Sequence, residues 1–255
     1  RGTDARVRYV PWLRPDYGLR QSRILRQYHT TDAVPPNADE YKEEEKTYMA
    51  LNHDPRCRQC RREGQKLMLK GERCKTEKCA MERRPFPPGM KTMRRRRSSS
   101  EYNLQLREKQ KMRRIYGILE KQFRTYFKRA AQFEGVTGEN LLQLLETRLD
   151  NIVYRLGFAP SRYGARQLVL HNHLTVNDKK VNIPSYQLKE GDTVSVKAQS
   201  KSLEHIHNSL RAAKELPEWL SIDKVKLSGT MVKKPAREDI PTNVQEQLVV
   251  ELYSK

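Results

Sequence analysis

Long apolar runs are missing from this chain of 255 residues, of which only 36% are apolar. A membrane-spanning helix requires about 18 to 20 consecutive apolar residues, so the sequence excludes a transmembrane protein of that kind. Acidic residues are also scarce, because 31 Asp and Glu stand against 51 Lys and Arg, which gives a formal net charge of +20. This excess favours a polyanionic partner over the plain alternative of a merely basic soluble enzyme.

The sequence also lacks a recognisable catalytic constellation. Asp150 has no second carboxylate, nucleophile or phosphate-binding loop beside it, so we interpret it as ordering a helix surface by pairing with a neighbouring arginine. His171 and His173 have no third ligand nearby, which favours an RNA-contact or surface role over metal binding. We therefore expect neither an enzyme nor a small-molecule substrate, and we find no internal repeat.

Residues 1–50 form an N-terminal extension that is first basic and then acidic. The first thirty residues hold seven arginines and only two acids, whereas the run from Glu43 to Glu45 is acidic. Neither part has a regular apolar period, so we expect no core of its own. An arginine-rich, acid-poor segment is typical of organelle-targeting leaders, but it also suits a basic arm that folds onto RNA.

Four cysteines cluster in the next segment, residues 51–100, which comprises a predicted zinc module and a basic linker. Cys57 and Cys60 are separated by two residues and Cys74 and Cys79 by four, so two pairs of thiolates can close a tetrahedral site around one zinc ion. Two disulfides, four ordinary reduced cysteines and an iron–sulfur cluster are the alternatives, the last with the same ligands. We expect the flanking cations to lower the pKa values of the thiols.

Apolar spacing predicts helices in residues 101–146. Met112, Tyr116, Phe123 and Phe127 recur at helical intervals, which favours core packing over base stacking, and Gly117 is placed to kink or divide the helix. Thr137 is the predicted N-cap of the following helix.

Shorter elements follow. Ser161 is the predicted cap of a helix, and alternating residues predict strands at 174–176, 181–183 and 193–196, with a turn at 177–178. We expect a helix from 203 and a final strand over 248–253.

Several long motifs resemble one known family. Residues 57–64, 71–74 and 79–85 look like the N-terminal zinc module of the bacterial-type small-subunit ribosomal protein family S-four (uS-four). The strings LREKQKMRRIYGILEKQF, LLETRLDNIVYRLGFAPSRYGARQLV and EQLVVELYSK are similar to the same family, in the family's order. The resemblance covers about residues 56–255, and residues 1–55 depart from it; many family members also lack the cysteines, so this chain resembles the zinc-binding subtype.

The resemblance implies an α+β fold: a zinc-binding N-terminal module, a mainly helical domain at 101–146 completed by the C-terminal segment 203–255, and an inserted small α/β RNA-binding module at 147–200, with two helices on a short antiparallel sheet. It implies a structural constituent of the small ribosomal subunit that binds small-subunit rRNA directly, nucleates assembly and lines the mRNA entry region. Neighbouring small-subunit proteins and mRNA are then further partners. By position, the mRNA-entry lining corresponds to Lys91, Arg94, Arg95, Arg96 and Arg97.

Cationic and polar side chains are the candidates for rRNA contact, because guanidinium and ammonium groups pair with phosphate oxygens. The set is Arg58, Arg61, Arg62, Lys70, Arg73, Arg83, Arg84, Lys109, Lys111, Arg113, Arg114, Arg162, Tyr163, Arg166, Gln167, His171, His173, Lys179 and Lys180. The alternative for any one of them is a solvated surface charge.

Two other functions remain as rivals: an RNA-modifying enzyme that carries the same RNA-binding module, and a zinc-dependent DNA-binding regulator. The first requires a separate catalytic domain, and the second requires a recognition helix beside the cysteines; neither is found in the sequence. For localisation, we expect the small ribosomal subunit of an organelle, the mitochondrion before the plastid, or of a bacterial cytoplasm.

Overall fold

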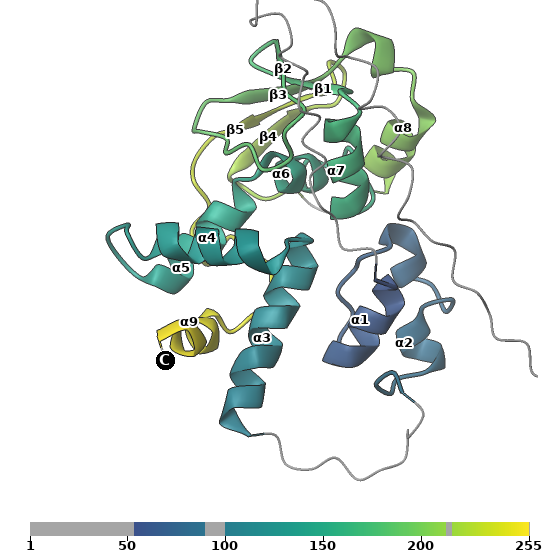
Figure 1. The fold of residues 1–255 in the computed structure, drawn as a ribbon. Helices are drawn as coiled ribbons and strands as arrows, with labels where there is room; N and C mark the ends of the chain where they lie inside the picture. The colour runs from purple at the N-terminus through teal and green to yellow at the C-terminus, as the bar shows by residue number, and fades with distance from the viewer. Residues whose placement is uncertain (1–53, 90–99, 213–215, 255) are drawn as a thin grey trace, which may run out of the picture. The chain divides into compact units, whose positions relative to one another are not determined.

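The computed structural model describes residues 54–89, 100–212 and 216–254, so the expectations for residues 1–50, Lys91 and the arginines at 94–97 lie outside the described part. Within it the elements form an α+β arrangement of three parts (Figure 1). The helical domain and the antiparallel sheet with its two helices agree with the expected fold class. No helix in these ranges is long and apolar enough to cross a lipid bilayer.

The cysteine module, residues 54–89, contains little regular structure. It consists of helix α1 (Arg56–Glu63), the short 3-10 helix η1 (Gly71–Cys74) and helix α2 (Ala80–Arg83). Leu67 and Leu69 are buried, and they belong to the same core as Met112 and Phe123 of the following helices. The module therefore obtains its apolar packing from the helical domain, because two leucines are too few for a core of their own.

The helical domain consists of α3 (Glu101–Tyr116), α4 (Glu120–Ala130), α5 (Thr137–Glu146) and α9 (Glu246–Ser254). Gly117 ends α3 with a φ of 66°, a left-handed conformation that favours glycine, so the predicted division of the helix is confirmed. Phe123 is fully buried and Phe127 packs on the same core, which confirms their core role. The predicted cap was wrong by one position: Thr137 is the first helical residue, and Val136 precedes it without a side-chain cap.

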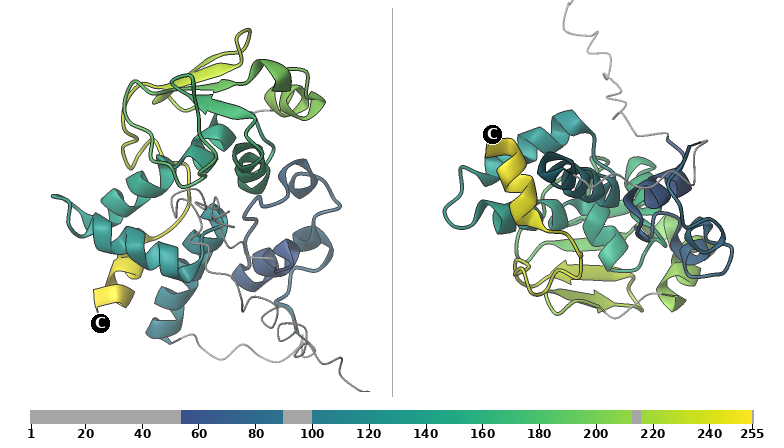
Figure 2. Two further views of the ribbon diagram at one scale, coloured as in Figure 1. Left: turned by 45° about the horizontal axis from the view of Figure 1, so that its top comes forward. Right: turned by 90° about the horizontal axis from the view of Figure 1, so that it is seen from below.

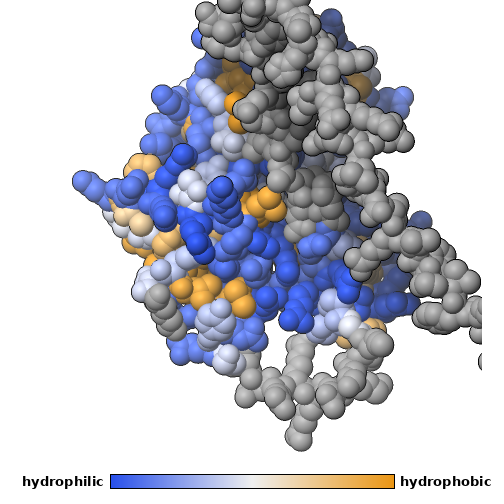
Figure 3. Space-filling model, in the orientation of Figure 1, coloured by the Kyte–Doolittle hydropathy of each residue, from blue (hydrophilic) through white to orange (hydrophobic). Residues whose placement is uncertain are grey.

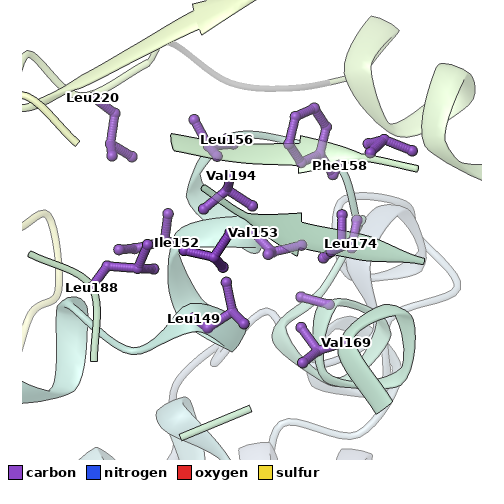
Figure 4. Close-up of a cluster of buried hydrophobic side chains, with 14 of the residues drawn as sticks. Leu149, Ile152, Val153, Leu156, Phe158, Val169, Leu174, Leu188, Val194 and Leu220 are labelled. Carbon is purple, nitrogen blue, oxygen red and sulfur yellow. The ribbon is translucent and has the colours of Figure 1, made fainter. Parts of the chain in front are cut away.

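The sheet module contains α6 (Leu149–Arg155), α7 (Arg162–Leu170) and a five-stranded antiparallel sheet in the order β2-β1-β3-β5-β4. The strands are β1 (Leu174–Val176), β2 (Lys179–Lys180), β3 (Thr193–Val196), β4 (Leu220–Asp223) and β5 (Ser228–Met231). The helices lie on one face of the sheet (Figures 1 and 2), and α6, α7, β1 and β3 share a core that includes Ile152, Val169 and Val194 (Figure 4). Outside the sheet lie η2 (Ala198–Ser200) and α8 (Glu204–Arg211).

The sheet holds its register through local features of the sequence. Asn177 and Asp178 both have positive φ, 46° and 63°, as a tight hairpin turn between β1 and β2 requires. Val176 faces Val194 across β1 and β3, and Val194 faces Gly229 on β5. A Cβ at Gly229 would lie only 2.4 Å from a methyl group of Leu156, so the absent side chain lets α6 approach the sheet.

Three expectations on the strands and the tail were wrong. Residues 181–183 form no strand. The backbone that follows them is hydrogen-bonded to the start of α6 instead, because the Leu149 amide donates to the Tyr186 carbonyl and the Asp150 amide donates to the Pro184 carbonyl. The C-terminal segment does not only complete the helical domain, since β4 and β5 join the sheet. The predicted strand at 248–253 is the helix α9, which packs against α3 and α5.

Candidate nucleic-acid interface

The four cysteines lie around one small cavity in the cysteine module. Cys57 and Cys60 come from α1, Cys74 from the end of η1 and Cys79 from the residue before α2, and all four line the cavity as free thiols. The backbone amide of Lys70 donates to the Cys74 sulfur at 3.4 Å. The four thiols therefore line one cavity, although within the described ranges no group of three or more His, Cys, Asp or Glu side chains is arranged so that it could hold a metal ion.

The pKa of the Cys60 thiol is shifted in the direction opposite to the one predicted from the sequence. Burial raises its pKa, and the other three sulfurs add to this effect, while a hydrogen bond from the backbone of Leu67 opposes it. The expectation that flanking cations lower the pKa was wrong for Cys60, because burial, which disfavours the charged thiolate, is the largest influence on its pKa.

The outer surface of the cysteine module is strongly cationic. Residues 54–89 hold eleven Lys and Arg and five Asp and Glu, a net of +6. Six of the predicted rRNA contacts are exposed here: Arg58, Arg62, Lys70, Arg73, Arg83 and Arg84. Arg61 is half-buried and donates to the carbonyl of Phe86 at 2.9 Å. We call the six exposed residues the module surface.

A second exposed set lies on the sheet module. Lys179 and Lys180 form β2 at one edge of the sheet, and both are exposed. Gln167 and His171, near the end of α7, are also exposed, while His173 is half-buried and its Nδ1 lies 2.9 Å from Ser200 Oγ. We call Lys179 and Lys180 the sheet-edge surface. Hydrophilic residues dominate the described part of the face drawn in Figure 3.

The remaining predicted rRNA contacts already have partners inside the protein. Arg114 pairs with Glu63, Lys111 with Glu108, and both Lys109 and Arg113 with Glu120. Arg162 Nε donates to Asn151 Oδ1 at 2.7 Å, and its guanidinium lies over the rings of Tyr116 and Tyr154. Tyr163 and Arg166 are buried, the first beneath the guanidinium of Arg56 and the second beside Asp150. Their contacts with RNA stay predictions, but the structure gives each of them a partner within the protein.

A buried charge cluster connects the helical domain with the sheet module, and the sequence did not predict it. The carboxylate of Glu146, fully buried at the end of α5, accepts hydrogen bonds from Arg155, Asn151 and Tyr116. Burial alone would raise the pKa of Glu146, but Arg155 and the other donors lower it to about 2. Charged residues at regular intervals within an otherwise apolar stretch are the signal that could have indicated this cluster.

A second buried pair lies nearby. Arg148 Nε donates to Asp150 Oδ1 at 3.0 Å and Nη1 to the hydroxyl of Tyr126 at 2.7 Å. The predicted pairing of Asp150 with an arginine is thus confirmed, although it lies in the interior rather than on a helix surface. Together the two clusters hold α6 and α7 in place against the helical domain.

Comparisons with known proteins agree with this arrangement. Residues 52–146 match the family described as Ribosomal protein S4/S9 N-terminal domain, and residues 147–194 match the S4 domain. The chain is 58% identical over 209 residues to "Small ribosomal subunit protein uS4" of Geotalea daltonii, covering 81% of this chain and 100% of that protein. Proteins of the same name from Heliobacterium modesticaldum and Nitrosospira multiformis are 59% and 54% identical over the same shares of both chains.

Proposed function

The chain belongs to the bacterial-type uS4 family of small ribosomal subunit proteins, and we propose that it binds small-subunit rRNA through the module surface and the sheet-edge surface. As a member of this family it is a structural rRNA-binding constituent of the small subunit and not an enzyme. The observation that carries the proposal is that the exposed cations among the predicted rRNA contacts lie on these two surfaces, whereas the other predicted cations have partners inside the protein.

Phosphate neutralisation is the physical basis of the proposed contact. Each Lys or Arg that meets a phosphate releases condensed counterions, so affinity falls as salt rises. Exposed arginines suit the wide, shallow groove and the backbone of folded RNA, which is recognised mostly by its shape. Of the two surfaces, the module surface contributes six cations and the sheet-edge surface two.

The test is equilibrium binding of the full chain to protein-free bacterial small-subunit rRNA at several salt concentrations, with large-subunit rRNA as competitor. We expect tight binding that resists the competitor and weakens steeply with salt. Equal affinity for both RNAs would contradict the proposal, because a merely basic protein binds any RNA.

We propose further that the four cysteines hold one zinc ion. Four thiols around one cavity suit the soft-ligand, tetrahedral preference of zinc, and a bound ion would connect α1, η1 and the start of α2. The ion's role is structural cross-linking. Elemental analysis of the purified protein should find about one zinc per chain; iron with visible absorption would favour the iron–sulfur alternative instead.

Assembly and mRNA contact are the remaining parts of the proposed function. We propose that the chain binds rRNA early in subunit assembly and that Lys91 and the arginines at 94–97, which lie outside the described residues, contact mRNA at the entry region. The test is crosslinking of mRNA in assembled subunits, compared between the full chain and a variant with Arg94 to Arg97 replaced by glutamine. We expect the crosslinks to disappear from this segment without loss of rRNA binding; unchanged crosslinks would contradict the mRNA assignment.

The compartment is also a proposal. The related proteins are bacterial, which supports a bacterial-type small subunit, and the arginine-rich extension is the reason to propose an organelle, the mitochondrion before the plastid. Immunogold labelling of the source cells distinguishes them: label inside mitochondria or plastids would support an organelle, and label throughout a bacterial cytoplasm would contradict it.

A further inference from the structure

A cavity of about 700 Å³ opens where the three parts of the described chain meet. Lys66 and Lys75 of the cysteine module line it, as do Lys111 of α3, Tyr154 and Arg162 of the sheet module, and Ala212, which follows α8. Lys66, Lys75 and Ala212 are exposed, so they mark its mouth, whereas Lys111 is buried. The volume lies within the range of about 300–1,000 Å³ that small-ligand pockets occupy.

The wall of this cavity is cationic. Five of its described lining residues are Lys or Arg, and Glu72 is the only acid among them. Glu146, the carboxylate that compensates Arg155 and Arg162, is fully buried behind them and does not line the cavity. Lys75 Nζ donates to the backbone carbonyl of Ala212 at 3.5 Å, an uncharged partner that an anion can replace. Lys66 and Lys111 pair with Glu82 and Glu108. Lys75, whose partner is uncharged, is therefore the lining cation that suits a phosphate.

The same cavity has flat and apolar surfaces. Tyr154 and Arg162 stand in its wall, and the guanidinium of Arg162 lies over the rings of both Tyr154 and Tyr116, 4.7 Å and 4.9 Å from their centroids. Ile115, Pro160 and Pro217 add apolar surface. Aromatic and guanidinium planes beside apolar groups are the surfaces on which unpaired nucleobases stack in RNA-binding proteins.

We propose that this cavity receives one unstacked nucleotide of the rRNA, with its base in the cavity and its phosphate at Lys75. The inference rests on the proposed rRNA binding and adds a site that reads an extruded base, beside the two surfaces that contact the backbone. A free mononucleotide offers the same chemistry, so the experiment must separate the two sources. Since the cysteine module supplies part of the wall, the site forms only when that module is docked.

The test uses the full chain and protein-free small-subunit rRNA. Ala212→Trp fills the mouth with a bulky side chain and leaves every charge in place, and Lys75→Gln removes the cation. Lys78→Gln is the matched control, because Lys78 is an exposed lysine of the same loop that does not line the cavity. Circular dichroism melting of each variant reports whether it folds. The readouts are affinity and the chemical modification of base edges along the rRNA.

We expect the wild-type chain to protect one unpaired base from modification, and Ala212→Trp to restore its reactivity and weaken binding about tenfold, as expected for one lost stacking contact. Lys75→Gln should weaken binding as well, and Lys78→Gln should leave the protected base unchanged. If Ala212→Trp melts like the wild type, protects the same bases and binds rRNA equally well, the nucleotide site is wrong while rRNA binding stands. If the wild-type chain fails to bind rRNA, the proposed function itself fails.

Nucleoside monophosphates provide the second arm. Calorimetric titration with each of the four should detect no binding below millimolar concentration, because the proposed ligand is held in place by the rest of the RNA. Micromolar binding of a monophosphate, lost in Ala212→Trp while rRNA affinity is unchanged, would overturn the proposal in favour of a soluble nucleotide.

Discussion

Arg155 and Glu146 form an ion pair in the interior, with Arg155 Nη2 2.7 Å from Glu146 Oε1. Glu146 ends α5 in the helical domain, and Arg155 ends α6 in the sheet module. Thr242, from the C-terminal segment, lies within 3.3 Å of the same guanidinium. A single carboxylate thus connects the ends of α5 and α6, nine residues apart, with the distant C-terminal segment, and it joins the helical domain to the sheet module.

Replacing this carboxylate should strongly destabilise the protein. Glu146→Gln leaves Arg155 and Arg162 buried without a counter-charge, which costs about 3–5 kcal/mol of unfolding free energy. Chemical denaturation measures the loss. Glu134→Gln, at an exposed position before α5, is the control and should change stability by less than about 0.5 kcal/mol. Equal stability of both variants would show that the cluster is not important for the fold.

Glu146 should also make the unfolding free energy depend on pH in the acidic range. The pKa of Glu146 is lowered to about 2 from an ordinary value of 4.5, so its contribution is complete above about pH 4.5 and is lost as the pH falls towards 2. The unfolding free energy should therefore decrease over that range by about 3 kcal/mol more in the wild type than in Glu146→Gln. Denaturation curves at pH 5, 4 and 3 check this difference, and parallel pH profiles of the two proteins would contradict it.

Loss of one cysteine of the proposed zinc site should loosen the cysteine module and leave the sheet module folded. Cys57→Ser removes one of the four thiols, so residues 56–82 should become accessible to protease while 147–198 stay protected by their own core. Gln65→Ser, an exposed position in the same module, is the control. Mass spectrometry of the fragments locates the cuts, and equal cleavage of both regions would count against separate folding units.

The sheet-edge surface should contribute to the salt dependence of RNA binding. Lys179→Gln with Lys180→Gln removes two exposed cations, so the slope of log affinity against log salt should become shallower by about 1.5–2. Lys224→Gln with Lys226→Gln is the matched control, because these exposed lysines join β4 and β5 at the opposite edge of the same sheet. If the two double variants behave alike, the contact is general attraction rather than a defined surface.

Local patterns in the sequence predicted much of the fold. The cap at Ser161 is confirmed by its hydrogen bond from the Gly164 amide, the division of the helix at Gly117 by its positive φ, and the turn at 177–178 by two positive φ values. Each of these features depends only on residues that are close in sequence: a side-chain oxygen that caps a helix, a glycine that adopts positive φ, and an Asn-Asp pair that forms a turn.

Features that depend on distant contacts were not predictable in the same way. The run at 248–253 is rich in residues that favour strands, yet it forms α9, because Val249 is buried in the helical core and the ring of Tyr253 stacks on Phe127 at 4.5 Å. Likewise, the sequence predicted Arg166 as an rRNA contact, but in the structure this residue is buried beside Asp150. Whether a charge faces solvent or the interior is decided by tertiary packing, which a local pattern does not contain.

This chain is an rRNA-bound constituent of the small ribosomal subunit. The most direct measurement is the sedimentation of the full chain in a gradient of source-cell lysate at physiological salt, followed by immunoblotting. Nearly all of the protein should migrate with small subunits and with complete ribosomes. Protein that stays at the top of the gradient, free of subunits, would contradict it.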